Sequence, residues 1–420
     1  MSRRTKPVDP TLSLAHFFGA ELRRRREQVG WSQQDLADRV LHGVDLVRKV
    51  ETAERFPSST LVTSCDDVLG ANGALIQTLP LLEREHALRS RRRPGRGGFD
   101  AADSDAAVLD WLIEPPRARP AAERVDDADL VVLDRLRTGD RRVGAGATHS
   151  RVVARIESGL DDLAARAPGL AVGFLELAGY QSVDLGADDR AQRHYLRAMR
   201  ITSRAGDRRY GGYLVGVSIA HLALHVDDAA RAERFAGAAL RGTRSVSTPA
   251  MRAAFHAVLA RARARRGDEP GCTAALLQAD TDLARSVPAE EPEWIRYFGE
   301  ADLADERAHC SFDLGRDTTA HREASGAVAM LDPSRVRRLA MDTALQASAM
   351  ARSGEVEGAC IAGRAAVDFA ACTTSYRSVQ RVTQMLAQLQ RHTDLLVVRE
   401  LVDHAAAVLP PPPMLRRTGS

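Results

Sequence analysis

The sequence predicts an all-α protein with a small N-terminal helical domain and a longer array of helix pairs. Three observations lead to this fold class. Hydrophobic residues make up 44% of the 420 residues but aromatic residues only 5%, a balance typical of helical proteins rich in Ala and Leu. Apolar residues recur with helical spacing along most of the chain. From residue 151 onward, a pattern of small residues repeats about every forty positions, as stacked helix pairs require.

The length of the chain predicts more than one domain, because a single hydrophobic core does not grow to this size. The segment 89–106 (RSRRRPGRGGFDAADSDA) is charged and rich in glycine, which indicates a flexible connection. We therefore divide the chain into an N-terminal domain at 1–88, a flexible linker with a short helix at 89–127, a helical array at 128–409 and a disordered tail at 410–420.

The distribution of charge indicates one basic end on a near-neutral body. Residues 1–99 hold 17 Arg or Lys against 12 Asp or Glu, whereas the whole chain has a formal net charge of +3. This asymmetry fits a nucleic-acid-binding N-terminal domain.

The cysteines and the apolar runs predict a cytoplasmic protein, nucleoid-associated when bound to DNA. The five cysteines are scattered without a Cys-x-x-Cys pair, which indicates buried thiols in a reducing compartment. No apolar run reaches the roughly 18 residues that a membrane span needs. The first residues, MSRRTKPVDP, lack the apolar core of a secretion signal. We therefore expect no membrane partner.

Five short helices are expected in the N-terminal domain. The first, over 17–28, places three apolar residues on one face: Phe18, Leu22 and Val29. Ser32 is a natural N-cap for the second helix, with Asp35 three residues later completing a capping box. The buried side of that second helix is expected to consist of Leu36, Ala37 and Val40.

The remaining helices of this domain follow after a break at 41–43. A third helix is expected over 44–52, with Val47 and Val50 buried. Ser58 or Ser59 caps a fourth helix that ends near Gly70, and residues 73–88 are expected to form the fifth.

This series of helices resembles the helix-turn-helix DNA-binding domain of phage repressors and their bacterial relatives, the XRE or Cro-like family. The matching elements, spaced as in that family, are Arg26, Gly30-x-Ser32-Gln33, Leu36-Ala37, Val47, Val50-Glu51, Pro57-Ser58 and Leu69-Gly70. The resemblance covers roughly residues 14–80. It implies a double-stranded DNA operator as partner, with the second helix across the backbone and the third in the major groove.

The resemblance also implies roles for individual residues. The positions that read bases in the family correspond here to Val44, Asp45, Arg48 and Lys49. Two residues match phosphate-binding positions, Ser32 and Gln33, and three arginines are further candidates that a solvated surface explains equally well: Arg23, Arg25 and Arg55. Arg26 and Glu51 match a buried ion pair between the first and third helices, which gives them a structural role.

Two residues depart from the family pattern in the turn between the second and third helices. Leu41 stands where the family has glycine, and a left-handed conformation is costly for leucine. Gly43 stands where the family has Ser or Thr as the cap of the third helix. The angle of the third helix is therefore left open by the sequence.

The C-terminal array is defined by five turn residues about forty positions apart: Gly186, Asp227, Gly267, Gly315 and Gly354. Seven residues before each turn stands a small residue: Gly179, Ala220, Ala260, Ala308 and Ala347. The residues five, nine and twelve positions after each turn are mostly alanine and fall on one helix face. The pattern predicts five helix pairs in which the small residue lets the first helix approach the second closely.

The repeated pattern resembles tetratricopeptide repeats, with a longer period and few of the aromatic positions. A helix at 151–166 and a final pair at 375–408 are expected to cap the ends of the array. The whole chain resembles actinobacterial regulators that join such a DNA-binding domain to helical repeats. That resemblance implies a homodimer and a peptide or small-molecule effector.

Several residues of the array are candidate ligands. His221 and His225 stand four apart, a spacing that can hold a metal, but without a third ligand we expect no metal and no cofactor. Trp294 and Tyr297 are expected to begin a repeat helix and, with the two histidines, to line a ligand groove or to pack in the core. Residues 144–150 (GAGATHS) lack the Gly-Lys-Ser/Thr ending of a phosphate loop and are expected to open a helix.

The functional prediction is therefore a dimeric, sequence-specific transcriptional regulator. No nucleophile–base arrangement is apparent, so we expect no enzyme. The alternative is a protein-interaction scaffold whose DNA-binding domain is vestigial.

Overall fold

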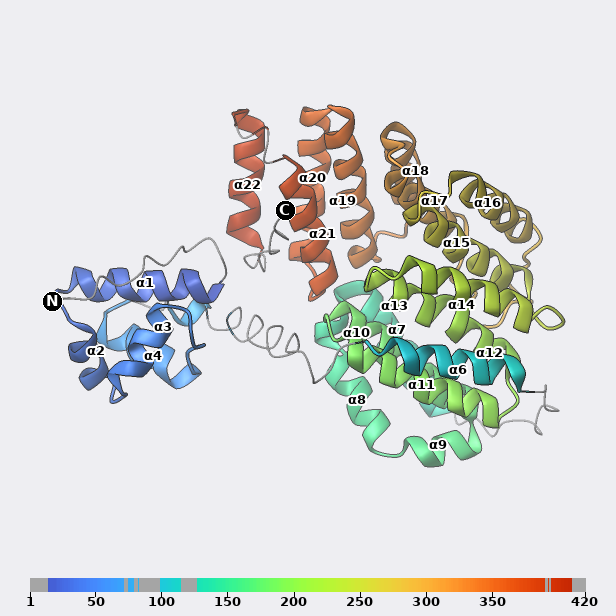
Figure 1. Ribbon diagram of the computed structural model, residues 1–420, viewed down its shortest axis with the longest axis horizontal. Coiled ribbons are helices and arrows are strands. Elements are labelled where there is room, and N and C mark those ends of the chain that lie inside the picture. The colour runs from blue at the N-terminus through green and yellow to red at the C-terminus, as the bar shows by residue number, and fades with distance from the viewer. Residues whose placement is uncertain are drawn as a thin grey trace. The chain divides into compact units, whose positions relative to one another are not determined.

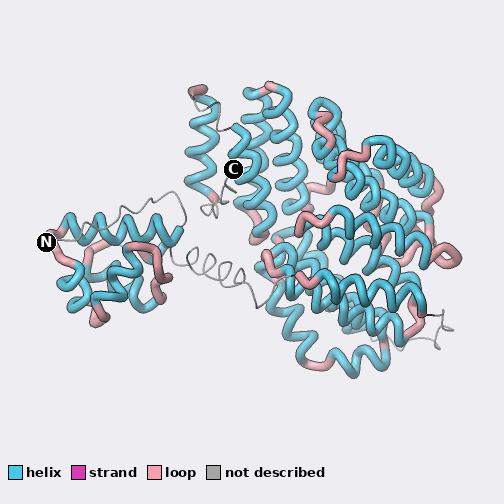
Figure 2. Tube along the Cα trace, in the orientation of Figure 1, coloured by secondary structure: helices cyan, strands magenta, loops and turns pink. Residues whose placement is uncertain are grey.

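The computed structural model describes residues 14–71, 75–78, 82, 99–114, 127–389, 392 and 394–409. Every regular element within these ranges is a helix, as Figure 2 shows, so the fold is all-α as predicted. The chain divides into two compact units, whose described parts lie within residues 1–96 and 97–409. None of the helices in the described ranges is long and apolar enough to cross a membrane.

Within its described residues, the N-terminal unit has four helices with assigned bounds and a short 3-10 turn (Figure 1): α1 (Leu14–Gln28), α2 (Gln33–Arg39), α3 (Val44–Glu51), α4 (Ser59–Val68) and η1 (Ile76–Thr78). Its core includes Phe18, Leu22, Leu36, Ala37, Val40, Val47, Val50, Leu61 and Val62, all of them buried. The expected burial of Val29 is wrong, because α1 ends at Gln28 and leaves Val29 in the following turn, 44% exposed. The predicted fifth helix at 73–88 falls largely outside the described residues.

The first helix of the larger unit is α6 (Ala101–Ile113), in a segment that the sequence assigned to a flexible linker. The short helix expected in this segment is therefore present, and over residues 101–113 the chain is not a free linker, because α6 packs on the array with Trp111 only 3% exposed. Its polar residues are partnered: the Gln192 side-chain amide donates to Ser104 Oγ at 2.8 Å, and Arg231 pairs with Asp105 at 3.0 Å. The polar residues Ser104 and Asp105, which are typical of a linker, therefore bind α6 to the array. Residues 89–98 and 115–126 lie outside the described part of the chain.

The array itself begins with three helices and a 3-10 turn: α7 (Asp127–Val143), η2 (Ala145–Ala147), α8 (His149–Glu157) and α9 (Leu160–Arg166). The single helix expected at 151–166 is thus two helices separated at Ser158 and Gly159. Residues 144–148 form a short turn and α8 begins at His149, so the segment 144–150 opens a helix as expected.

Six pairs of helices follow, and Figure 1 shows them stacked side by side. They are α10 (Pro168–Asp184) with α11 (Asp188–Arg204), the helix 208–225 with α14 (Ala229–Gly242), α15 (Pro249–Arg265) with α16 (Glu269–Leu283), α17 (Glu300–Asp313) with α18 (Asp317–Met330), α19 (Val336–Ser353) with α20 (Val356–Ala371), and α21 (Tyr376–Leu389) with α22 (Leu396–Val408). This arrangement is consistent with a helical solenoid. The tail at 410–420 lies outside the described residues.

The five turn residues predicted from the repeat all connect the two helices of a pair. Each has a positive φ: Gly186 at 70°, Asp227 at 62°, Gly267 at 76°, Gly315 at 73° and Gly354 at 91°. The small residues seven positions earlier are all buried, as are those five and twelve positions later. The sequence pattern of the repeat therefore has two structural causes. A positive φ is needed where the chain turns, and small residues are needed where the two helices approach closely.

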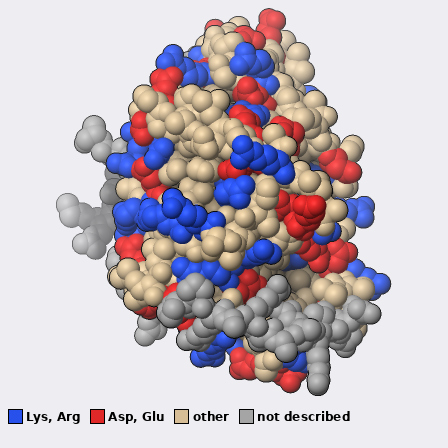
Figure 3. All heavy atoms as spheres, turned by 90° about the vertical axis from the view of Figure 1, so that its right-hand side faces the viewer, with Lys and Arg blue, Asp and Glu red and all other residues tan. Residues whose placement is uncertain are grey.

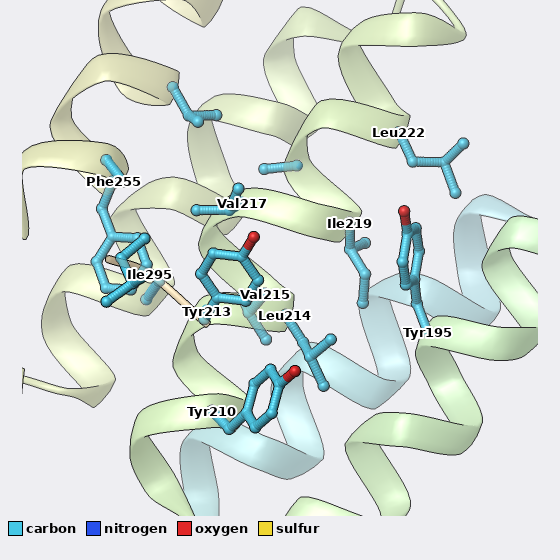
Figure 4. Packing of buried hydrophobic residues seen from close by; sticks show 14 of the residues in the cluster. Tyr195, Tyr210, Tyr213, Leu214, Val215, Val217, Ile219, Leu222, Phe255 and Ile295 are labelled. Atoms are coloured by element: carbon cyan, nitrogen blue, oxygen red, sulfur yellow. The ribbon is translucent and has the colours of Figure 1, made fainter. Parts of the chain in front are cut away.

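The helix 208–225 is continuous but irregular. It consists of α12 (Arg208–Tyr213), a π-helical turn η3 (Leu214–Ile219) and α13 (Ala220–His225), and all six residues of the π turn are buried. Figure 4 shows Leu214, Val215, Val217 and Ile219 packed in the core between Tyr195 and Phe255. A Cβ at Gly216 would lie only 2.5 Å from the Ala239 Cβ, so the close approach of α14 requires glycine there.

Residues in the C-terminal part of the array contact its first helices, α7 and α10. Arg337 of α19 lies 2.8 Å from an Asp140 carboxylate oxygen of α7 and donates a 2.9 Å hydrogen bond to the Tyr180 hydroxyl of α10. Ser375, just before α21, donates to Asp184 of α10 at 2.6 Å. These contacts join helices that are well over a hundred residues apart in the sequence.

Candidate nucleic-acid interface and the inner face of the array

The second helix of the N-terminal unit begins at a fully formed cap. The Asp35 backbone N–H donates to Ser32 Oγ at 3.1 Å, and the Ser32 backbone N–H donates to the Asp35 carboxylate at 2.8 Å. This capping box is the one predicted from the sequence, and it satisfies backbone groups that a helix start otherwise leaves unpaired. It also fixes the start of α2 relative to the turn that follows α1.

The short turn between α2 and α3 contains one residue with a strained backbone conformation, Leu41. Leu41 adopts a left-handed conformation with φ of 54°, and its side chain is 89% exposed. Gly43 is the N-cap of α3 and has no side chain to accept a hydrogen bond. The turn is therefore retained despite both departures from the family pattern.

Behind the turn, α1 and α3 are joined by a buried ion pair. Arg26 Nε lies 2.6 Å from Glu51 Oε1, and a second hydrogen bond of 3.0 Å links Nη2 to Oε2. Arg26 also donates to the Trp31 carbonyl at 2.7 Å, while the Gln33 side-chain amide donates to Glu51 at 2.7 Å. Glu51 is 1% exposed, so these contacts hold α1, α2 and α3 together and are closed to solvent.

The four predicted base-reading residues lie together on α3, on the side away from the core. Val47 and Val50 face the core, whereas Val44 is 39% exposed. Asp45 pairs with both neighbouring cations, at 2.8 Å from Arg48 and 2.6 Å from Lys49. The hydrogen bond from Lys49, followed by that from Arg48, lowers the pKa of Asp45. In the absence of DNA, these three charges therefore neutralise one another in part.

The five predicted phosphate-binding residues have different surroundings. Ser32 and Gln33 stand at the start of α2, where both side chains already make the contacts within the domain described above. Arg23 pairs with Glu27 and Arg25 with Glu21, each at 2.7 Å. Arg55 is exposed just after α3. All five remain predictions as phosphate ligands.

His221 and His225 do not share a ligand position, because each faces a different carboxylate. His221 Nε2 lies 3.1 Å from Glu306, which also pairs with Arg261 at 3.1 Å. His225 Nε2 faces Asp188 at 3.5 Å. Within the described ranges, no group of three or more His, Cys, Asp or Glu side chains is arranged to hold a metal ion.

Trp294 and Tyr297 lie in the connection between α16 and α17, because α17 begins only at Glu300. The expectation that they begin a helix is therefore wrong. Trp294 stacks on Tyr210 with ring centroids 4.6 Å apart, and the Tyr297 hydroxyl lies 3.1 Å from that of Tyr213. The connection thus places four aromatic rings together, and both Trp294 and Tyr297 keep part of their surface exposed.

The sequence reasoning missed Tyr210 and Tyr213, which form the other half of this aromatic cluster. Beside them, Arg137 of α7 lies 3.4 Å from the Tyr210 hydroxyl and 3.8 Å from Glu176 of α10. The sequence does contain one indication of this cluster: two tyrosines three positions apart lie on one helix face, in a chain with few aromatic residues. Their partners came from helices distant in sequence, which no local pattern indicates.

Comparison with known proteins agrees with the geometry of the N-terminal unit. Residues 18–79 match the family described as "Helix-turn-helix domain", a range that includes α2, the strained turn and α3. No curated protein matches the chain significantly. The N-terminal unit is therefore a helix-turn-helix domain, of the kind that DNA-binding regulators carry.

Proposed function

We propose that this protein is a dimeric, sequence-specific transcriptional regulator whose helical array pairs two DNA-binding domains and responds to an effector. The observation that carries the proposal is the arrangement of α3, which presents Val44, Asp45, Arg48 and Lys49 together while Val47 and Val50 anchor it in the core. A helix that enters the major groove N-terminal end first needs this division between a reading face and a buried face.

The proposed contacts follow from the chemistry of the four side chains. Arg48 and Lys49 suit guanine O6 and N7, Asp45 suits the cytosine amino group, and Val44 suits a thymine methyl group. Binding at the groove replaces the Asp45 ion pairs by contacts to bases. The phosphate contacts are assigned to the start of α2, through Ser32 and Gln33, and to Arg23, Arg25 and Arg55.

The dimer is proposed because one helix-turn-helix domain reads only a half-site. Two domains paired by symmetry read two half-sites about one helical turn apart, which multiplies specificity. The array, which we propose to be of the tetratricopeptide-like type, is large enough to supply the pairing surface. The proposed site of the effector, a peptide or a small molecule, is a groove lined by the partly exposed Trp294 and Tyr297 and by His221 and His225.

Gel-shift titrations with a selected operator test the reading role of α3. Arg48→Ala and Lys49→Ala should each weaken specific binding by about 1–3 kcal/mol per base contact while changing the preferred sequence. Arg316→Ala is the matched control, because it removes one positive charge from an exposed pair with Glu269 in the larger unit. Equal losses in the control and in the α3 variants, or no sequence-specific shift by the wild type, would contradict the proposal.

A second candidate, an interaction scaffold with a vestigial DNA-binding domain, is favoured by one observation. Asp45 pairs with both cations of the reading face and offsets part of their charge, which reduces the attraction of α3 to the DNA backbone. Asp45→Asn distinguishes the two functions. In a working reading domain it raises affinity for non-specific DNA and alters the preferred base, whereas in a scaffold neither the variant nor the wild type selects a sequence.

A further inference from the structure

Helix α6 lies on the surface of the array beside α11 and α14, as Figure 1 shows. Near the C-terminal end of α6, the Trp111 ring packs on α14, where a Cβ at Gly242 would lie only 2.4 Å from the ring. Nearer the N-terminal end, Asp105 pairs with Arg231 at 3.0 Å. These two contacts fix α6 beside α14, and the two helices run in the same direction.

The face of α6 that points away from the array is apolar and acidic. Leu109 is 57% exposed and Ile113, one helical turn later, is 70% exposed. Asp103 and Asp110 are exposed on the same face, and their side chains make no ion pair or hydrogen bond with another side chain among the described residues. We call these four residues the α6 ridge. Large apolar side chains exposed together on one helix face, beside unpaired acids, are typical of an interaction surface.

An open groove between α14 and α15 lies on the other side of α14 from α6. Helical spacing places Gly237, in the middle of the groove, about 140° around α14 from Gly242, which contacts α6. Leu240 and the buried Leu259 give the groove an apolar base. An added Cβ at Gly237 would meet only the end of the Arg241 side chain, at 3.3 Å, so this glycine keeps the groove open and is not required by helix packing. The charged residues that line the groove are Glu233, Arg234, Arg241, Arg263 and Arg266.

Arg241 differs from the other arginines of the groove because it has no carboxylate partner. Its side chain makes no ion pair and no hydrogen bond within the described part of the chain. The other three arginines do pair, in contacts of Arg234 with Asp105 and of Arg263 and Arg266 with Glu233. Arg241 is therefore available to an acid from outside, as Asp110 on the α6 ridge is available to a base.

The longer parts of the chain outside the described residues are basic and do not suit this groove. Each carries more Arg and Lys than Asp and Glu: 1–13, 83–98, 115–126 and 410–420. On the face of the protein in Figure 3, Lys and Arg side chains alternate with Asp and Glu side chains, so charge is arranged in small local groups. A partner must therefore match the groove locally. The α6 ridge of a second copy does so, because it carries acids and large apolar side chains on one helix face.

The ridge and the groove lie side by side along α14, and this arrangement suits two-fold symmetry. A two-fold axis parallel to α14 and between them places each ridge opposite the groove of the other copy and keeps every residue at its level along α14. Trp111 and Gly242 contact each other and thus lie at one level. Their chain neighbours Asp110 and Arg241 share that level, so Asp110 of one copy comes to face Arg241 of the other. The apolar residues of the ridge then cover the apolar base of the groove.

We propose that two copies of the chain pair through this exchange, with the α6 ridge of each copy in the α14–α15 groove of the other. The contact removes exposed apolar side chains from water and brings opposite charges together, each twice. The proposal rests on the dimeric regulator proposed above and assigns the surface that pairs its two DNA-binding domains.

Sedimentation velocity of the full chain without DNA measures the dimerisation constant. Asp110→Arg and Arg241→Glu should each weaken dimerisation about tenfold or more, because like charges then face each other at both contacts. An equimolar mixture of the two variants should recover dimers. In a mixed pair, the introduced arginine faces the introduced glutamate at one contact, and the unchanged acid faces the unchanged arginine at the other. Arg364→Glu is the matched control, because Arg364 is exposed on α20, and it should leave the constant unchanged.

A second pair of variants tests the apolar part of the contact. Ile113→Ser should weaken dimerisation about tenfold or more, because it removes the most exposed apolar side chain of the ridge. Ile361→Ser is its matched control, since Ile361 is 74% exposed but lies on α20, and it should leave the dimerisation constant unchanged. Circular dichroism and the midpoint of thermal unfolding show whether each variant keeps its fold.

Three results would overturn the proposal. One is a wild type that stays monomeric, whether or not the groove then binds an acidic peptide or DNA. Another is a dimer that neither Asp110→Arg nor Arg241→Glu weakens, which keeps the dimeric regulator and moves its interface elsewhere. The third is a mixture of these two folded variants that forms no dimers. Operator binding is measured separately by gel shift, so a dimer formed through α6 without a specific shift retains the interface and removes the regulatory role.

Discussion

At the scale of single residues, Leu41 and Ala53 are the two non-glycine residues with a positive φ in the described part of the DNA-binding domain, and Leu41 lies in its helix-turn-helix turn. A left-handed conformation costs a residue with a Cβ roughly 1–2 kcal/mol, and the exposed Leu41 side chain recovers little of this through packing. The turn persists because the capping box of α2 and the Arg26–Glu51 pair fix the helices on both sides of it. The strain is therefore stored locally and can be removed by substitution.

Leu41→Gly should stabilise the N-terminal domain by about 0.5–1 kcal/mol. Glycine adopts the left-handed conformation without steric cost, which outweighs the entropy that it loses on folding. Chemical denaturation followed by circular dichroism measures the change. Leu41→Ala is the control, since it removes the exposed side chain but keeps the Cβ; equal stabilisation by both variants would show that exposure and not backbone strain was the cause.

The residue scale also shows where sequence reasoning stops. Arg26 and Glu51 were paired in advance because their positions match a known family, and the structure contains that pair. The contact of Gln33 with Glu51 and the double pairing of Asp45 were not anticipated. Such contacts depend on the rotamers of long side chains in the folded protein, and the spacing of residues in the sequence does not determine those rotamers.

At the scale of elements, the alternation of turns and small residues made the helix pairs predictable. In the first pair, a Cβ on Gly179 would lie only 2.3 Å from the Tyr195 ring, so the large residue on α11 requires glycine on α10. In the second pair, Ala220 and Ala236 occupy the same two positions, and both are fully buried. In the first pair, the large residue on the second helix is thus matched by glycine on the first helix, and in the second pair two small residues meet. The spacing between the two helices is thereby kept although the residues differ.

Other elements were not predictable for physical reasons. Residues 99–106 are polar and the segment before them is rich in glycine, so local composition indicated a linker. Only the distant partners Gln192 and Arg231 make α6 a part of the array. The π turn of helix 208–225 likewise depends on the close packing of α14 and α15 against Gly216 and has no local signature.

Two glycines of the array should respond to alanine in opposite ways. Gly354 ends α19 with φ of 91°, so Gly354→Ala should destabilise the array by about 1–2 kcal/mol. Gly326 lies inside α18, where an added Cβ meets nothing within 4 Å, so Gly326→Ala should stabilise it by about 0.5–1 kcal/mol. Urea denaturation of both variants measures the difference. A stabilising Gly354→Ala would refute the role assigned to the turn residues.

At the scale of the whole molecule, the array has two large hydrophobic cores that are joined through α17, α18 and α19. One core extends from α6 to α17, and a second, rich in alanine, lies within α19–α22. Between them, α17, α18 and α19 share a small cluster of Ala308, Ala324 and Leu345. Ion pairs also cross this joint, chiefly those of Arg338 with Asp302 and Asp305. The contacts of Arg337 with α7 and α10 bypass this joint and connect the second core directly to the beginning of the first.

Arg337→Met should therefore separate the two cores during unfolding. The substitution leaves Asp140 and Asp184 buried without their cation, a loss of about 3–5 kcal/mol. Scanning calorimetry should then show α19–α22 unfolding in an earlier, separate transition, and hydrogen exchange should locate the added opening in α7 and α19.

The control for this prediction is Arg316→Met, whose exposed pair with Glu269 should contribute less than about 1 kcal/mol. Adding Asp140→Asn to Arg337→Met removes one of the uncompensated charges and should recover part of the stability. An unchanged calorimetric profile for Arg337→Met would mean that the hydrophobic joint alone couples the two cores. If the transitions separate, the attachment of α19 and of the residues just before α21 to the first helices is what makes the array a single cooperative unit.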